Sequence, residues 1–285
     1  MTVIAPTTLA AAVAALADDP GITVLAGGTD LMVGVNDGRH RPASVLSLRR
    51  VDGLRGWQRE GDELVLGGAT TYTDLLAPDL AALAPGLAMA ARTVGSPQIR
   101  NTGTIGGNLA TASPAGDTLP VLVALGAEVV LVSHRGERRM PVEQFLTGPK
   151  RSALDPDELV AEVRLPAADG PQEYLKIGVR NAMVIAVASC ALVVRRTERT
   201  VRCVLGAVGP VPVRAPEAEA WVAGRIDWDA GRLNDGSVAA EFGSQLAAAA
   251  RPIDDHRATA AYRRTAAGVL ARRALERAFP APVVP

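Results

Sequence analysis

Thr104-Ile105-Gly106-Gly107-Asn108 repeats the glycine pair of an earlier stretch, Ala26-Gly27-Gly28-Thr29-Asp30. The expected fold and function both depend on these two glycine loops. A glycine lets the backbone approach a ligand closely and adopt a positive φ. Successive backbone N–H groups can then converge on phosphate oxygens, and a helix that begins just beyond adds its positive dipole end. Thr29, Thr104 and Asn108 add side-chain donors at the same places. The two loops therefore suggest a site for a diphosphate.

Neither loop matches a known nucleotide fingerprint by spacing. The expected strand 23–26 is not followed by Gly-x-Gly-x-x-Gly, and no Gly-x-x-x-x-Gly-Lys-Ser/Thr is present. Glycine pairs are also common in turns, so each loop taken singly is better explained as a turn than as a ligand site. Residues 93–113 carry several glycines and no hydrophobic periodicity, which predicts a long irregular segment of the kind that usually has a function. From the residues alone, a phosphate site and a pair of turns both stay open.

The composition indicates a globular protein without the excess of positive charge that a polyanion or an acidic membrane would attract. The chain has 285 residues, 48% of them hydrophobic, and a formal net charge of zero. This balance argues against nucleic-acid binding and against a polybasic membrane surface. No segment is long enough to span a membrane. Leu9, Val13 and Leu16 fall on one face of an expected helix that Thr7 or Thr8 can cap. No Lys or Arg precedes this helix, so we read it as an amphipathic helix rather than a signal peptide and expect a cytoplasmic protein.

Metal-binding and nucleophilic motifs are missing from the sequence. Cys190 and Cys203 lie in separate apolar segments without Cys-x-x-Cys spacing, so we predict two buried thiols and neither a zinc site nor an iron–sulfur cluster. His40, His134 and His256 are isolated from one another and lie outside both glycine loops. Solvent-exposed or structural roles are therefore expected for these histidines. No Gly-x-Ser-x-Gly elbow is present, and no catalytic residue is assigned.

The expected elements form a mixed α+β part followed by three strands and then helices. Strands are predicted at 23–26, 45–48, 63–66, 129–132, 173–176, 184–194 and 201–208, and helices at 9–17, 83–91, 117–125, 229–250 and 258–278. The break Pro166–Pro171 predicts a domain boundary, with domains at 1–168 and 172–280. The arginines of the last helix are expected on a solvated face, with a partner interface as the alternative.

Two charged residues have two interpretations each. Asp117 precedes an apolar helical run, so it can cap that helix, and it can also contact a ligand. Lys176 can be a surface lysine or a cation held near a diphosphate or a ring.

The segments around both loops closely resemble the FAD-binding medium subunit of molybdenum hydroxylases, the family of the xanthine dehydrogenase and carbon monoxide dehydrogenase flavoproteins. The matching segments are Leu25–Leu31, Val94–Asn101, Thr104–Asn108, Ala112–Asp117 and Leu154–Leu159. The resemblance covers almost the whole chain and is strongest from Val24 to Lys176. Both loops, in this order, are a far more specific signal than either alone.

The resemblance implies an α+β fold of the vanillyl-alcohol-oxidase (PCMH) type. Two subdomains, about 1–56 and 57–168, would hold FAD without a covalent link, and a smaller α+β domain, 172–280, would cover part of the flavin. The residues implied in cofactor binding are Val24, Leu25, Ala26, Gly27, Gly28, Thr29, Asp30, Leu31, Val94, Thr104, Ile105, Gly106, Gly107, Asn108, Asp117, Val160 and Lys176.

The sequence departs from the family pattern at a few positions. Val94 stands where some relatives carry an aromatic near the flavin ring, and Asn181 and Val184 stand where relatives often carry Arg and Asp. The ring packing near Val94 and an ion pair at the other two positions are therefore not expected here.

The implied function is electron transfer inside a larger enzyme. A large subunit would hold the molybdenum cofactor, a small subunit would hold two [2Fe–2S] clusters, and this chain would pass electrons to an external acceptor in a heterotrimer or its dimer. Two alternatives stay open: a stand-alone FAD-dependent oxidase of the same fold, and a non-catalytic assembly protein in which the glycines are only turns.

Overall fold

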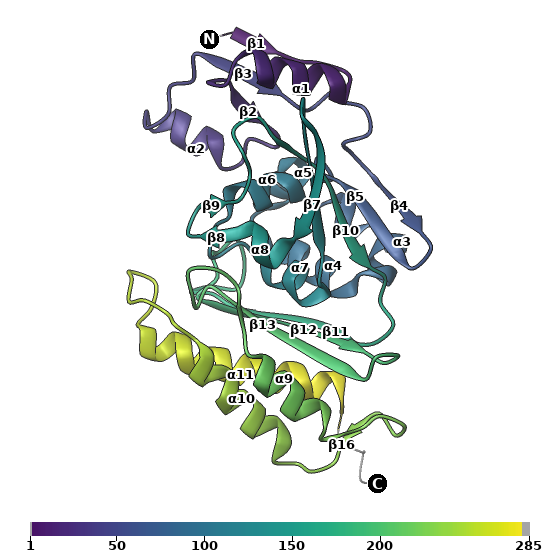
Figure 1. The fold of residues 1–285 in the computed structure, drawn as a ribbon. Helices are drawn as coiled ribbons and strands as arrows, with labels where there is room; N and C mark the ends of the chain where they lie inside the picture. The colour runs from purple at the N-terminus through teal and green to yellow at the C-terminus, as the bar shows by residue number, and fades with distance from the viewer. Residues whose placement is uncertain (1, 281–285) are drawn as a thin grey trace. The chain divides into compact units, whose positions relative to one another are not determined.

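The computed structural model describes residues 2–280, which form two compact units (Figure 1). Unit 1 contains the chain up to Ala77 together with Ser96–Ser113 and Gly126–Pro166. Unit 2 contains Pro78–Gly95, Pro114–Leu125 and the chain from Ala167 onward. Compactness thus assigns two pieces of the expected first domain to unit 2, and the division at 168 and 172 stays a prediction.

Unit 1 begins with a small parallel sheet covered by a helix. Its strand order is β1-β3-β2, formed by β1 (Thr2–Ile4), β3 (Ser44–Ser47) and β2 (Thr23–Leu25). Helix α1 (Leu9–Asp18) buries Val13 and Leu16, and the Thr8 side chain accepts a hydrogen bond from the Ala11 N–H. This helix and its cap are confirmed as predicted.

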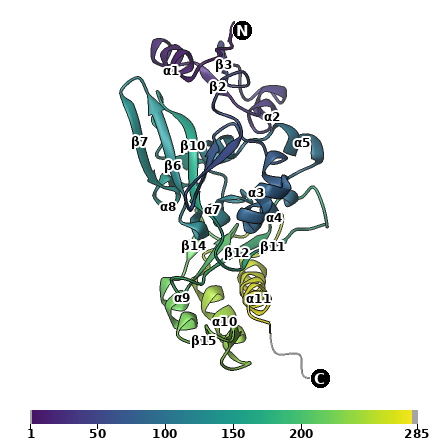
Figure 2. The same cartoon turned by 90° about the vertical axis from the view of Figure 1, so that its right-hand side faces the viewer.

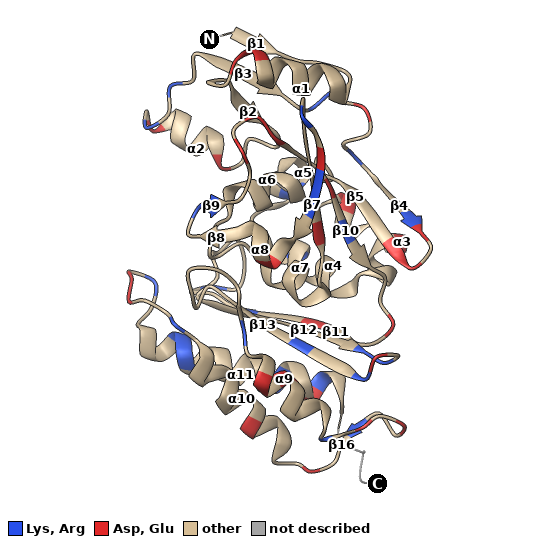
Figure 3. Ribbon diagram, in the orientation of Figure 1, with Lys and Arg blue, Asp and Glu red and all other residues tan. Residues whose placement is uncertain are grey.

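The second sheet of unit 1 is antiparallel, with the order β4-β5-β10-β6-β7. Its strands are β4 (Trp57–Glu60), β5 (Glu63–Gly67), β10 (Leu159–Pro166), β6 (Glu128–Ser133) and β7 (Gly136–Pro141). Figure 2 shows β10, β6 and β7 side by side. The outer strand β7 carries charges of both signs on its exposed residues (Figure 3), as suits the edge of a sheet. The remaining elements of unit 1 are α2 (Leu31–Asn36), the 3-10 helix η1 (Asp74–Leu76), α5 (Pro97–Thr102), α6 (Ile105–Thr111), α8 (Val142–Phe145), β8 (Leu146–Gly148) and β9 (Arg151–Ser152).

Unit 2 is a four-stranded antiparallel sheet with helices on both faces (Figure 1). Its strands, in order, are β11 (Gln172–Ile177), β12 (Ala188–Arg195), β13 (Thr200–Gly206) and β14 (Val213–Arg214). Seven of the eight residues of β12 are buried, and all of these seven except Ser189 are apolar. The helices are α3 (Pro78–Leu83), α4 (Pro85–Thr93), α7 (Leu119–Leu125), α9 (Pro216–Ala223), α10 (Val238–Ala249) and α11 (Ala260–Ala278), and a hairpin joins β15 (Ile226–Asp227) to β16 (Arg232–Leu233).

Helices α10 and α11 pack closely because each places a glycine at their crossing. A Cβ added to Gly243 would lie 2.6 Å from the Gly268 carbonyl oxygen, and one added to Gly268 would lie 2.7 Å from that of Gly243. Only glycines allow two backbones to approach this far. The long final helix is thereby held against the sheet through α10 as well as directly.

Two sequence-based expectations were wrong. Residues 93–113 are not irregular, since they contain α5 and α6. These helices lack an amphipathic period because they are short and depend on their caps: the Ser96 and Thr104 side chains accept from Ile99 N–H and Gly107 N–H. The helix expected at 229–250 begins only at Val238, after a strand and a turn.

Candidate cofactor site

The first glycine loop is held tightly at one end by the backbone of α5. A Cβ added to Gly27 would lie 1.9 Å from the Thr102 carbonyl oxygen, so no other residue fits there without displacement of the chain. Gly28 adopts a φ of +73°, in the left-handed region that favours glycine. The loop therefore needs both glycines, for two different reasons.

The N–H groups of this loop are unused among the residues that the structure describes. No described residue accepts a hydrogen bond from the backbone N–H of Gly27, Gly28, Thr29 or Asp30. Further along the chain, Met32 N–H donates to the Gly28 carbonyl over 2.9 Å. Three of these four residues are partly buried, where an unpaired donor costs free energy. A run of successive free N–H groups matches the needs of a diphosphate, so these residues fit the cofactor.

The second glycine loop has the opposite property, because the N–H groups of its residues Ile105 to Asn108 all donate within the protein. Ile105 N–H donates to the Thr70 carbonyl over 3.0 Å, and Gly106 N–H donates to the Gly68 carbonyl over 2.9 Å. Gly107 N–H donates to Thr104 Oγ1 and Asn108 N–H to the Thr104 carbonyl. The expectation that both loops offer backbone donors is therefore wrong for the start of α6. A Cβ on Gly106 would lie 2.5 Å from the Gly68 oxygen, so this glycine serves close backbone packing.

The structure brings the two loops side by side although they are far apart in sequence. Gly27 lies against Thr102 and Gly103, and a Cβ on Gly107 would lie 3.8 Å from that of Ala26. The second loop thus supports the first loop, which presents the free donors.

Replacing Thr104 by valine is expected to remove the α6 cap, because its Oγ1 accepts from Gly107 N–H over 3.1 Å. The expected loss of stability is about 1 kcal/mol, measured by urea denaturation. Thr8→Val, which removes the α1 cap, is the matched control. Both variants should be destabilised, whereas only Thr104→Val should weaken FAD binding, by about threefold at an added cost of about 0.6 kcal/mol. Equal FAD affinity in the two variants would contradict a supporting role for the second loop.

Asp117 and Lys176 form a buried ion pair within unit 2. Lys176 Nζ lies 2.6 Å from Asp117 Oδ2, and each side chain is 7% exposed. Tyr174 OH donates to Asp117 Oδ1 over 2.9 Å, and Thr93 Oγ1 lies 3.3 Å from Asp117 Oδ2. Helix α7 begins at Leu119, so the expectation that Asp117 caps it is replaced by this ion pair, and Lys176 is not a surface lysine.

Burial shifts the pKa values of the acidic groups in this cluster. It raises the pKa of Asp117, while the Lys176 ammonium opposes that rise. Burial also raises the pKa of Tyr174 well above its ordinary value, so the phenol is a neutral donor. Lys176 has three N–H donors. Two of them meet Asp117 and the Thr93 carbonyl, and no further acceptor for Lys176 is found among residues 2–280. One donor of a positively charged group is thus available to a ligand.

Tyr174 and Thr93 are members of this cluster that the sequence analysis missed. Tyr174 could have been found, because residues at i and i+2 of a strand share a face and Tyr174 stands two before Lys176 in β11. Thr93 lies at the end of α4, and nothing in the sequence links it to Asp117. Of the remaining candidates, Val94 is partly buried after α4 and Val160 is 8% exposed at a bulge in β10.

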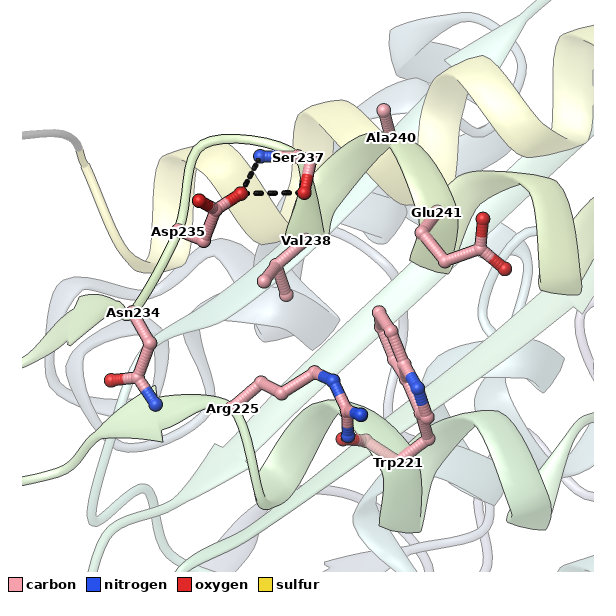
Figure 4. Close-up of a pocket in the computed structure, with 8 residues that line it drawn as sticks. All are labelled: Trp221, Arg225, Asn234, Asp235, Ser237, Val238, Ala240 and Glu241. Carbon is pink, nitrogen blue, oxygen red and sulfur yellow. Dashed lines mark hydrogen bonds between the residues drawn. The ribbon is translucent and has the colours of Figure 1, made fainter.

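A shallow hollow of about 550 Å³ lies elsewhere in unit 2 (Figure 4). Arg225 stacks over Trp221 at 4.2 Å, and Asp235 and Glu241 also line the hollow. None of the candidate cofactor residues lines it.

Cys190 and Cys203 are both buried, as predicted, and their sulfur atoms lie 3.4 Å apart without a disulfide. No cluster of His, Cys, Asp and Glu arranged for a metal ion is found in the described part of the chain. Within the same residues, no helix combines the length and the apolar character needed to cross a bilayer.

Comparison with known proteins identifies both parts of the chain. Residues 1–168 match the model of the FAD binding domain in molybdopterin dehydrogenase, and residues 173–278 match that of the CO dehydrogenase flavoprotein C-terminal domain. The glyceraldehyde dehydrogenase medium chain of Sulfolobus acidocaldarius is 32% identical over 256 residues, which cover 88% of this chain and 89% of that protein. The xanthine dehydrogenase FAD-binding subunit of Escherichia coli O157:H7 is 32% identical over 222 residues, with coverage of 74% and 75%.

The fold agrees with that of a solved relative. Carbon monoxide dehydrogenase from Hydrogenophaga pseudoflava contains a chain with a TM-score of 0.88 and 32% identity, and the match covers 98% of this chain and 96% of that one. This likeness confirms the predicted α+β FAD-binding fold with an α+β C-terminal domain. The protein therefore belongs to the family of FAD-binding medium subunits of molybdenum hydroxylases and is an FAD-dependent oxidoreductase subunit.

Proposed function

We propose that this chain is the electron-transfer subunit of a molybdenum hydroxylase: it accepts electrons from the [2Fe–2S] clusters of a small partner subunit and passes them to an external acceptor. A large partner subunit would hold the molybdenum cofactor and act on the organic substrate. The assembly would be a heterotrimer or its dimer in the cytoplasm. The domains would be 1–168 for FAD binding and 172–280 at the C-terminus.

The observation that carries the proposal is the run of unpaired N–H groups from Gly27 to Asp30. Four successive donors without an acceptor in the described chain suit a doubly charged diphosphate, and turns alone would leave them unexplained. Their presence therefore favours the cofactor-binding subunit over a non-catalytic assembly protein.

The cofactor residues would divide the work. The stretch Val24–Leu31 would bind the diphosphate and its flanks, and Thr104–Asn108 would hold that loop in place while Asn108 adds a side chain. Val160 would contact the adenine side, and Val94 would lie near the ring. Asp117 and Lys176 would bind the cofactor through the one Lys176 donor that the cluster leaves available.

Bound FAD would supply the redox chemistry. The chain's own contribution is to bind and orient the cofactor and to fix the charge near it. A positive ammonium held beside a carboxylate at 2.6 Å gives that position a defined field. This field would influence how readily the bound cofactor accepts electrons.

The proposal is tested by isolating the chain together with the proteins that co-purify with it. We expect iron, acid-labile sulfide and molybdenum in the other chains and FAD in this one. Reduction by substrate under anaerobic conditions should give the electron paramagnetic resonance signals of [2Fe–2S] clusters. Removal of FAD should abolish reduction of the external acceptor while the cluster signals remain. Full substrate turnover by the isolated chain would instead support a stand-alone oxidase.

A further inference from the structure

Arg263 is a buried arginine near the start of α11 in unit 2, and the proposed function does not use it. Its side chain is 5% exposed although it belongs to α11, whose arginines were expected on a solvated face. Its guanidinium donates from Nη1 to the Val187 carbonyl over 2.7 Å and to the Ala207 carbonyl over 3.0 Å. From Nη2 it donates to Asp255 Oδ1 over 2.6 Å. Such a costly burial of charge calls for a specific role.

Val187 and Ala207, whose carbonyl groups accept from Arg263, also donate through their own N–H groups to the two segments that carry the ion pair. Val187 N–H donates to the Ile177 carbonyl over 2.8 Å, and Ile177 follows Lys176 in the chain. Ala207 N–H donates to the Pro114 carbonyl over 3.1 Å, and Pro114 lies three residues before Asp117. One guanidinium therefore braces the backbones that carry both members of the pair.

The Ala207 connection depends on an uncommon backbone conformation. Ala207 has a φ of +61°, in the left-handed region that costs a non-glycine residue free energy. The hydrogen bonds on both sides of Ala207, from Arg263 to its carbonyl and from its N–H to Pro114, compensate for that cost. Without Arg263, Ala207 loses one of the two hydrogen bonds that hold it in this conformation.

Charge explains why an arginine occupies this position. The planar guanidinium presents several donors in fixed directions, so one side chain can satisfy two carbonyls and a carboxylate together. Asp255 supplies the opposing charge, and the neighbouring N–H of Arg257 and the Arg263 guanidinium hold the pKa of Asp255 well below its ordinary value. Asp255 therefore stays ionised at neutral pH, and the buried cation is neutralised.

We propose that Arg263 is a positioning residue for the Lys176–Asp117 pair, acting through Val187 and Ile177 on one side and through Ala207 and Pro114 on the other. The relevance of this role to the cofactor rests on the proposed function. A lysine at 263 has no fork of donors, so it cannot hold both carbonyls and the carboxylate in this geometry.

The test compares Arg263→Met and Arg263→Lys in the full-length chain. The matched controls are Arg264→Met, the exposed neighbour on α11, and Leu270→Ala, a buried change on the same helix that makes none of these hydrogen bonds. Hydrogen exchange of the FAD-free protein, followed by mass spectrometry, is compared with the melting temperature of each variant. For a given loss of melting temperature, we expect Arg263→Met to raise hydrogen exchange more than Leu270→Ala does in three segments, 114–118, 177–188 and 207–209. Equal exchange in these segments would overturn the proposal.

A second measurement separates this inference from the proposed function. The dissociation constant for FAD is measured by quenching of flavin fluorescence for Arg263→Met, Arg263→Lys and Lys176→Met. We expect about a tenfold weakening for Arg263→Met with partial rescue by lysine, and the midpoint potential of the bound flavin should shift in the same direction as for Lys176→Met. If Lys176→Met binds FAD normally, the assignment of the pair to the cofactor fails, while the exchange result alone decides the positioning role. If Lys176→Met weakens binding and Arg263→Met does not, the positioning role is overturned.

Discussion

Gly27→Ala is expected to weaken FAD binding by about 100-fold, which corresponds to about 2.7 kcal/mol. The added Cβ would lie 1.9 Å from the Thr102 carbonyl oxygen and 2.7 Å from its carbon, so the loop must move away from α5. The contact is with backbone on both sides and cannot be relieved by a rotamer change. Movement of the loop would turn the free N–H groups of Gly27–Asp30 away from their common target. The measurement is a fluorescence titration of the purified variant with FAD.

The matched control is Gly148→Ala in the same unit. A Cβ at Gly148 would lie 3.9 Å from the nearest Arg151 atoms, an ordinary contact distance, and its φ is not in the left-handed region. This variant should bind FAD like the parent protein. Unchanged affinity in Gly27→Ala, with its fold intact by circular dichroism, would remove the first loop from the site.

Lys176→Met is expected to have the second large effect, because it should lower both the stability of the fold and the affinity for FAD. It leaves the Asp117 carboxylate buried with only the Tyr174 and Thr93 hydroxyl groups. Removal of one partner of a buried pair costs about 3–5 kcal/mol. The melting temperature should fall by about 10 °C, and FAD binding should weaken by about tenfold. The exposed Lys150→Met is the control and should change neither quantity measurably.

The pH dependence of this loss follows from the pKa of Asp117. Burial already raises the pKa of Asp117 in the parent protein, and the Lys176 ammonium opposes that rise. In Lys176→Met the ammonium is gone, so the pKa of Asp117 rises further. The folded variant therefore keeps the Asp117 proton to a higher pH than the unfolded chain does. Stability from such a group is present below the unfolded pKa, about 3.9, and is lost as pH rises through the folded value. The difference in melting temperature between parent and variant should therefore widen from pH 4 to pH 7. A difference that narrows over this range would contradict a buried ionised pair, and recovery of stability in Asp117→Asn/Lys176→Met would support it.

The sequence predicted those parts of the fold that rest on strong local patterns. The first helix followed from Leu9, Val13 and Leu16 and a threonine cap, which the structure places at Thr8, and β12 followed from its largely apolar sequence. The segment 93–113 was mispredicted because α5 and α6 are set by caps and by backbone packing with Gly68 and Gly103, which leave no periodicity.

The sequence predicted some features of the site and missed others, because the missed ones depend on tertiary contacts. Both glycine loops were visible, yet which of them keeps free N–H groups depends on tertiary partners such as Thr70 and Gly68. Asp117 and Lys176 were each singled out, but their pairing crosses 59 residues and was not predicted. The role of Arg263 has no local signal, because it depends on carbonyl groups 76 and 56 residues away.

The most direct test of the central claim is a titration of the purified, cofactor-free chain with FAD, followed in the visible spectrum and by flavin fluorescence. We expect one FAD per chain, a perturbed flavin spectrum on binding, and full release of the flavin when the protein is unfolded, since no covalent link is expected. A folded chain that shows no flavin bands and does not quench the fluorescence of added FAD would contradict the account.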